Sequence, residues 1–227
     1  CPVAMSQATI DRLMAWVEAG GTLIAEGCMG YFSEHGHAFE HQPSRGLEQL
    51  LSCTQASVHQ GPDMWTTLRF AADTGSVGGG VYRQAFTPAE GRCAGRYQEG
   101  DCAVVEHAFG KGRVRAIGTM AGYAYHNAPD EQTRRFFASH LPFAGQKPYA
   151  QTPWNTGIVT RIWADHDRTF VWVVNTTEAD QRATVLLDSD RFHFTSVRVL
   201  RGTEATLQPT GFSIFCPQRD AVVVELV

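Results

Sequence analysis

Residues 13–25 read Leu-Met-Ala-Trp-Val-Glu-Ala-Gly-Gly-Thr-Leu-Ile-Ala, and this stretch decides the expected fold. The Gly20-Gly21 pair ends a helix predicted over about 7–19, with Ser6 as its N-cap. Thr22 to Ala25 then reads as a short strand covered on both faces. Helix, double glycine and buried strand predict half of a βαβ unit. The apolar stripe of the helix has the spacing i, i+3, i+4, i+7, at Ile10, Leu13, Met14 and Val17.

The chain downstream of this stretch continues the pattern less regularly. A glycine- and histidine-rich loop over 27–42 precedes a short helix over 47–51. Irregular strands lead to a hairpin, in which 103–109 and 113–118 flank the turn Gly110-Lys111-Gly112. A second helix is expected over about 130–141. These elements predict an α/β fold of flavodoxin-like type, an open sheet with helices on both faces.

A domain boundary is expected between Pro142 and Pro153, where Pro, Gly and Gln are frequent. We place the domains at 1–148, N-terminally incomplete, and 149–227. Beyond the boundary the apolar pattern alternates with period two, which predicts a small antiparallel β-sandwich. Its expected strands cover 158–163, 169–175, 183–187, 196–200 and 221–227.

Composition narrows the possible partners. The formal net charge is −4 with both signs interspersed, so no basic stripe favours nucleic acid or an anionic membrane. No apolar run approaches the roughly 20 residues that a spanning helix needs. The six cysteines are scattered without a CxxC pair, which indicates reduced thiols and a cytoplasmic protein. Residues 1–5 read as the tail of a strand entering a helix, so a fragment of a longer protein is expected.

Several of these motifs resemble one family. The run 13–25 resembles the trimerisation domain of family 42 glycoside hydrolases, the bacterial β-galactosidases. Phe109-Gly110-Lys111-Gly112-Arg113, leading to Ala116-Ile117-Gly118-Thr119, looks like the closing hairpin of that domain. Residues 171–175 and 219–226 are similar to the family's C-terminal β-domain. The resemblance covers nearly the whole chain through short motifs in the same order.

The resemblance implies a non-catalytic role for this chain. The family's catalytic (β/α)₈ barrel, with its two carboxylates and its galactoside substrate, would lie upstream. This portion would carry oligomerisation, with a homotrimer as the expected assembly and no cofactor. No residue of the chain can be assigned the two carboxylate roles.

A second hypothesis makes the first region an enzyme. The trimerisation domain is similar to class I glutamine amidotransferases, and Cys28 in Glu26-Gly27-Cys28-Met29-Gly30 occupies the position of their nucleophile. In amidotransferases the nucleophilic cysteine works with a histidine and an acidic residue as a triad, and His126 and Asp130 come at a comparable point of this sequence. An amidotransferase-like or peptidase-like site is therefore conceivable. However, Glu26 stands where the family has glycine, and His126 and Asp130 are four residues apart rather than two. A vestigial or structural Cys28 is therefore favoured.

Two weaker signals concern ligands. His35 and His37 form a His-x-His pair that could bind zinc, but a solvated polar loop is favoured. Carbohydrate binding by the sandwich is a third functional hypothesis and needs an exposed aromatic platform. Core packing is favoured for Trp163 and Trp172, because both lie in predicted strands. The aromatic residues expected at an exposed rim or subunit contact are Trp65, Tyr123 and Tyr125.

Overall fold

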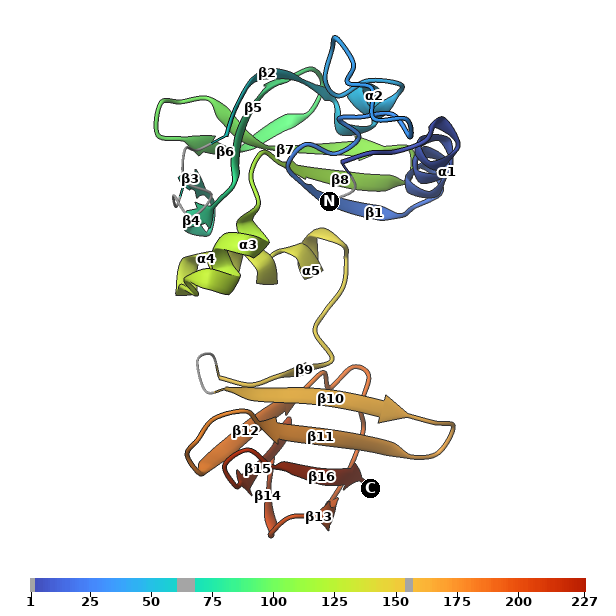
Figure 1. Ribbon diagram of the computed structural model, residues 1–227. Helices are drawn as coiled ribbons and strands as arrows, with labels where there is room; N and C mark the ends of the chain where they lie inside the picture. Colours follow the sequence, from blue (N-terminus) through green and yellow to red (C-terminus); the bar gives the residue numbers. More distant parts are fainter. Residues whose placement is uncertain (1–2, 61–67, 154–156) are drawn as a thin grey trace. The chain divides into compact units, whose positions relative to one another are not determined.

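The computed structural model describes residues 3–60, 68–153 and 157–227. Trp65 therefore lies outside the described residues. The chain divides into two compact units, Cys1–Gly145 and Gln146–Val227 (Figure 1). No described helix has both the length and the apolar character that crossing a bilayer requires.

The predicted helix and strand at the start of the chain are confirmed. Helix α1 spans Gln7–Glu18, and strand β1 spans Thr22–Glu26. Ser6 caps the helix, its hydroxyl accepting a hydrogen bond from the Thr9 N–H at 3.2 Å. Ile10 and Val17 are fully buried, so the apolar stripe faces the core.

The double glycine ends α1 with a Schellman motif. The Gly20 N–H donates to the Val17 carbonyl at 2.9 Å, and the Gly21 N–H donates to the Trp16 carbonyl at 3.0 Å. Gly20 has a φ of +122°, which other residues rarely adopt. The Trp16 ring covers Gly21, and a Cβ at Gly21 would lie 2.5 Å from that ring. Both glycines are therefore required where they stand.

The first unit is built on an eight-stranded sheet in the order β1-β8-β7-β6-β3-β4, with β5 paired to β7 and β2 paired to β5. Among the described strand pairs, only β1–β8 is parallel. Its remaining strands are β2 (Cys53–Gln60), β3 (Leu68–Ala72), β4 (Gly75–Gly79), β5 (Tyr82–Pro88), β6 (Arg92–Tyr97), β7 (Cys102–Phe109) and β8 (Gly112–Ile117).

The prediction of a flavodoxin-like α/β fold is wrong. More of this unit's residues lie in strands than in helices, and its sheet is almost entirely antiparallel. The sequence misleads because the order of helix, double glycine and strand at 7–25 is typical of a βαβ unit, whereas here β1 is an edge strand and no other described strand pair of the sheet repeats its parallel pairing with β8. Strand β7, which was predicted in a hairpin, is covered on both faces. Cys102 and Val105 pack in one apolar cluster with α1 and α2 (Leu47–Leu51), whereas Ala103 and Val104 pack in another with α3 (Ala121–Asn127) and α4 (Glu131–Ala138).

The predicted hairpin at 103–118 is confirmed. Strands β7 and β8 pair in antiparallel register, with Phe109 opposite Gly112. Gly110 has a φ of +58° in the turn between them. The helix expected over 130–141 is interrupted: α4 ends at Ala138 and a short helix α5 (His140–Phe143) follows.

The second unit consists of two four-stranded antiparallel sheets, ordered β10-β11-β16-β13 and β14-β15-β12-β9. One apolar cluster, including Val171, Val185 and Phe212, lies between them. The strands β9, β14 and β15 were not predicted. The strands are β9 (Ala150–Gln151), β10 (Ile158–Ala164), β11 (Thr169–Asn175), β12 (Gln181–Leu187), β13 (Val197–Arg201), β14 (Ala205–Gln208), β15 (Gly211–Cys216) and β16 (Ala221–Leu226).

The cysteines differ from the expectation of reduced thiols throughout. Cys93 of β6 and Cys102 of β7 form a disulfide between neighbouring strands. Their Cα atoms are 5.8 Å apart, within the usual range for such a bond. The other cysteines in the described part of the chain, Cys28, Cys53 and Cys216, are free and buried.

Candidate functional site

The turn after β1 holds Cys28 in an inert environment. Gly27 and Cys28 both have positive φ, at +29° and +52°, so the chain bends sharply at the predicted elbow. The Cys28 side chain is buried, and its N–H donates to Gln84 Oε1 at 3.0 Å. Burial raises the pKa of the Cys28 thiol to about 11. The thiol is therefore protonated near neutral pH, which is the opposite of an activated nucleophile.

The structure does not assemble the three suggested triad residues. His126 is exposed on α3, and Asp130 is the N-cap of α4. Asp130 accepts hydrogen bonds from the Thr133 N–H at 2.9 Å and the Thr133 hydroxyl at 2.7 Å. Partial burial alone would raise the pKa of Asp130, but these bonds outweigh it and hold the pKa below its usual value. Among the described residues, no hydrogen bond or ion pair joins any two of Cys28, His126 and Asp130.

The His35 and His37 side chains are exposed in a tight loop. Their ring centroids lie 6.5 Å apart, and both backbone N–H groups donate to the Ser33 hydroxyl at 3.2 Å. In the part of the chain that the structure describes, no three His, Cys, Asp or Glu side chains are grouped to hold a metal ion.

The free edge of β1 forms an open, largely apolar groove of about 570 Å³. Within the described chain, β1 pairs with β8 on one side and with no strand on the other. An unpaired strand edge of this kind presents backbone N–H and C=O groups to a partner. Helix α1 contributes Thr9 and Leu13 to the groove, β1 contributes Leu23 to Glu26, and Phe137 and His140 come from α4 and α5.

Burial shifts the pKa of two titratable groups in the groove. Burial raises the pKa of Glu26, while a hydrogen bond from the Gly122 N–H at 2.8 Å partly opposes the shift. Burial lowers the pKa of His140 to about 4, with a further contribution from the charge of Arg115. Glu26 and His140 are the only titratable side chains among the residues that line the groove, so the groove carries few charges, as expected at the centre of a protein interface.

An ion-pair network fixes His140. Arg115 donates from Nε and Nη2 to Glu106 Oε1 at 2.9 and 2.6 Å, and its Nη1 lies 2.6 Å from His140 Nδ1. Because a guanidinium group only donates, His140 Nδ1 must accept and the proton must reside on Nε2. His140 Nε2 is buried and has no hydrogen-bond partner among the described residues.

The comparison with protein families decides the identity of the first unit. The family described as the β-galactosidase trimerisation domain matches residues 3–136. The chain belongs to this family. The resemblance inferred from residues 13–25 and 109–119 is confirmed, and all residues that line the groove at β1 except Phe137 and His140 fall within the matched range.

Solved structures share the fold of the whole chain, the trimerisation domain included. A catalytic mutant of Gan42B, a GH42 β-galactosidase from G. stearothermophilus, is 20% identical with a TM-score of 0.76, covering 99% of this chain and 30% of its own. The β-galactosidase from Bacillus circulans sp. alkalophilus is 14% identical with a TM-score of 0.71, and the match covers 99% of this chain and 32% of that protein. α-L-Fucosidase isoenzyme 2 from Paenibacillus thiaminolyticus is 15% identical with a TM-score of 0.63, and the match covers 99% of this chain and 39% of that protein. The chain thus spans about a third of the length of these proteins. A search among curated proteins finds no relative of this chain.

The second unit lies outside the matched trimerisation domain and carries an aromatic surface. Trp163 was expected in the core, but half of its side chain is exposed and it stacks on Phe170 with ring centroids 5.4 Å apart. Trp172 is partly buried, with its ring 6.3 Å from that of Phe170.

The groove residues beside β1 were not predicted as a site. The signal that could have found them is the short apolar strand directly after the double glycine, at the sheet edge.

Proposed function

We propose that this chain is the non-catalytic assembly portion of a β-galactosidase-type glycoside hydrolase. The observation that carries the proposal is the match of the trimerisation-domain family over residues 3–136. The solved β-galactosidases with this fold are about three times as long as the chain. The catalytic barrel and the galactoside site of the parent enzyme would accordingly lie in polypeptide outside these 227 residues.

The assembly we propose is a homotrimer in which the β1 groove of each subunit receives a different surface of its neighbour. Contacts between unlike surfaces generate a closed ring when the rotation between subunits closes. The free strand edge, the largely apolar lining and the small number of titratable side chains support this role for the groove. Burying an apolar surface of this kind is the main driving force of association.

The proposal is tested with a variant of the parent enzyme that ends just before the residue equivalent to Cys1 and therefore lacks the portion described here. We expect the intact enzyme to sediment as a trimer and the truncated enzyme to sediment as a smaller species. The isolated 227-residue chain should not hydrolyse nitrophenyl β-galactoside. Hydrolysis by the isolated chain, or an unchanged trimer after truncation, contradicts the proposal.

The amidotransferase-like alternative has less support. It needs a reactive thiolate, whereas Cys28 is buried and its pKa is raised to about 11. It also needs a base next to the thiol, and His126 is exposed on a separate helix. Rapid alkylation of Cys28 at neutral pH would favour the alternative.

A cytoplasmic location is part of the same proposal. The three buried free thiols support it, and the Cys93–Cys102 disulfide is the observation against it. Mass spectrometry of protein alkylated during cell lysis decides the question: two additional free thiols at Cys93 and Cys102 support the cytoplasm, and a bridged pair contradicts it.

A further inference from the structure

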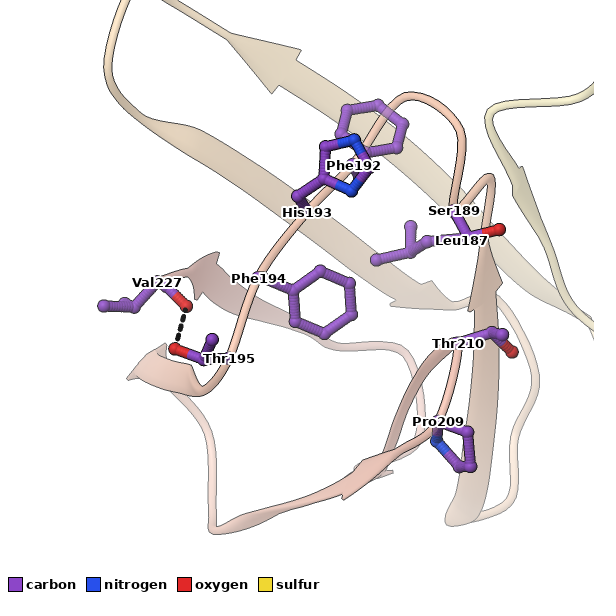
Figure 2. A pocket seen from close by; sticks show the side chains of 9 residues that line it. All are labelled: Leu187, Ser189, Phe192, His193, Phe194, Thr195, Pro209, Thr210 and Val227. Carbon is purple, nitrogen blue, oxygen red and sulfur yellow. Dashed lines mark hydrogen bonds between the residues drawn. The ribbon is translucent and has the colours of Figure 1, made fainter.

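The second unit contains a concave pocket of about 390 Å³ at one end of its two sheets (Figure 2). One wall is the segment between β12 and β13, which contributes Phe192, His193, Phe194 and Thr195. The facing wall is the turn between β14 and β15, with Pro209 and Thr210. Figure 2 shows the Phe194 ring between these walls, facing Leu187 and Thr210.

We propose that this pocket binds a neutral carbohydrate of one or two sugar units. The lining combines apolar rings with hydroxyl groups. Phe192 and Phe194 supply aromatic surface, on which the C–H face of a pyranose ring can pack. Ser189 and Thr210 supply hydroxyls that can donate and accept, as sugar hydroxyls require. The Thr195 hydroxyl donates to the Val227 carbonyl oxygen at 3.4 Å and can still accept (Figure 2).

The charge of the lining selects against ionic ligands. None of the nine lining side chains belongs to Asp, Glu, Lys or Arg. An ionic group would lose hydration in this lining, where His193 is the one side chain that can carry a charge. The volume also lies within the range of small-molecule sites, which extends from about 300 to 1,000 Å³.

The walls of the pocket are held in place before any ligand binds. The Thr195 N–H donates to the Val227 carbonyl at 2.8 Å, and the Leu187 N–H donates to the Thr210 carbonyl at 2.7 Å. Phe192 packs edge-on against Tyr149, with ring centroids 6.4 Å apart. A preformed site loses less conformational entropy on binding, so a small neutral ligand can bind with useful affinity.

The test is a titration of the 227-residue chain with methyl β-galactoside and, separately, methyl β-glucoside, followed by backbone amide NMR. We expect saturable shifts at residues 189, 193–195 and 210 for at least one of the two sugars. Two variants target exposed lining residues, His193→Ala and Thr210→Val. Each should weaken binding about tenfold or more. The matched control is His166→Ala, because His166 is exposed on the β10–β11 turn and does not line the pocket.

Absence of saturable shifts with both sugars overturns the proposal. Equal affinity in the wild-type chain and both pocket variants also overturns it, because binding would then lie elsewhere. The sedimentation of the parent enzyme should be unchanged by His193→Ala, since the pocket lies in the second unit. Failure of this proposal is therefore distinguishable from failure of the assembly proposal.

Discussion

Gly112 of β8 lies against the end of helix α1 so closely that a Cβ on it would stand 2.0 Å from the Val17 carbonyl oxygen. The same Cβ would stand 2.2 Å from the carbonyl oxygen of Gly21. Next to it, the Lys111 N–H donates to the Glu18 carbonyl at 2.9 Å. The β7–β8 turn is therefore docked on the Schellman end of α1, and the two motifs that suggested the family form one packed contact.

Replacing Gly112 with alanine should destabilise the first unit strongly. The added methyl group meets backbone oxygens that cannot move without distorting α1, so we expect a loss of about 2–4 kcal/mol in the free energy of unfolding. Gly78→Ala is the control, because a Cβ at Gly78 makes its nearest contact at 3.5 Å, to Thr133 Oγ1. Urea denaturation of both variants measures the difference, and equal losses would contradict the docked turn.

Cys28 should react slowly with alkylating reagents. Its pKa of about 11, against an ordinary value of 9.0, reduces the thiolate fraction at pH 7.5 about 100-fold. We expect iodoacetamide to label Cys28 at least about 100-fold more slowly in the folded chain than in urea, measured by peptide mass spectrometry. The rate should rise steeply between pH 9 and 11. Similar rates in the two states would mean that the thiol is accessible and ionised.

The stability of the first unit should fall as the pH drops from about 6.5 to 4. The folded state keeps His140 neutral, with a pKa of about 4, whereas the unfolded chain takes up a proton near 6.5. The stabilisation is thus present above pH 6.5 and is lost as the pH falls through this range. The variant His140→Gln keeps an acceptor for Arg115 but cannot be protonated, so its urea midpoint should depend less on pH.

The control for His140 is His126→Gln, since His126 is exposed on α3. This variant should retain the pH dependence of the wild-type chain. If His140→Gln and His126→Gln behave alike, the buried neutral state of His140 is not the cause.

Glu225 should stabilise the second unit through its two arginines. Its Oε1 accepts from Arg168 at 2.8 Å and its Oε2 accepts from Arg198 at 2.7 Å, and these bonds hold its pKa below the usual value. Because the folded pKa is lowered, the stabilisation is lost as the pH falls below about 4.5. Glu225→Gln should lower the urea midpoint at pH 7. Glu178→Gln, which removes an exposed partner of Arg219, should leave it unchanged.

Local signals predict α1, β1 and the β7–β8 hairpin because capping residues and turn glycines act over a few positions. Ser6, Gly20 and Gly110 each have the conformation that their residue type favours. The direction of the strands outside this hairpin could not be predicted in the same way. The helix and strand at 7–26 have the sequence of a βαβ unit, and no local signal shows that the sheet around them is almost entirely antiparallel.

The two candidate sites depend on contacts that are distant in the sequence. The groove joins Thr9 with Phe137, and the pocket joins Phe194 with Thr210. The segment Phe192-His193-Phe194-Thr195, with aromatic residues alternating with polar ones, was the only local signal of the pocket. In the sequence alone, this segment cannot be distinguished from an ordinary connection between two strands.

Sedimentation velocity of the parent enzyme with Thr9→Arg shows whether the β1 groove holds the subunits together. Thr9 is exposed and lines the β1 groove, so an arginine there blocks the proposed subunit contact. Ala15→Arg places the same side chain on an exposed position of α1 outside the groove. We expect the wild type and Ala15→Arg to sediment as trimers and Thr9→Arg to dissociate. A Thr9→Arg enzyme that stays trimeric, or a wild type that sediments as a monomer, would rule out the β1 groove as the trimer contact.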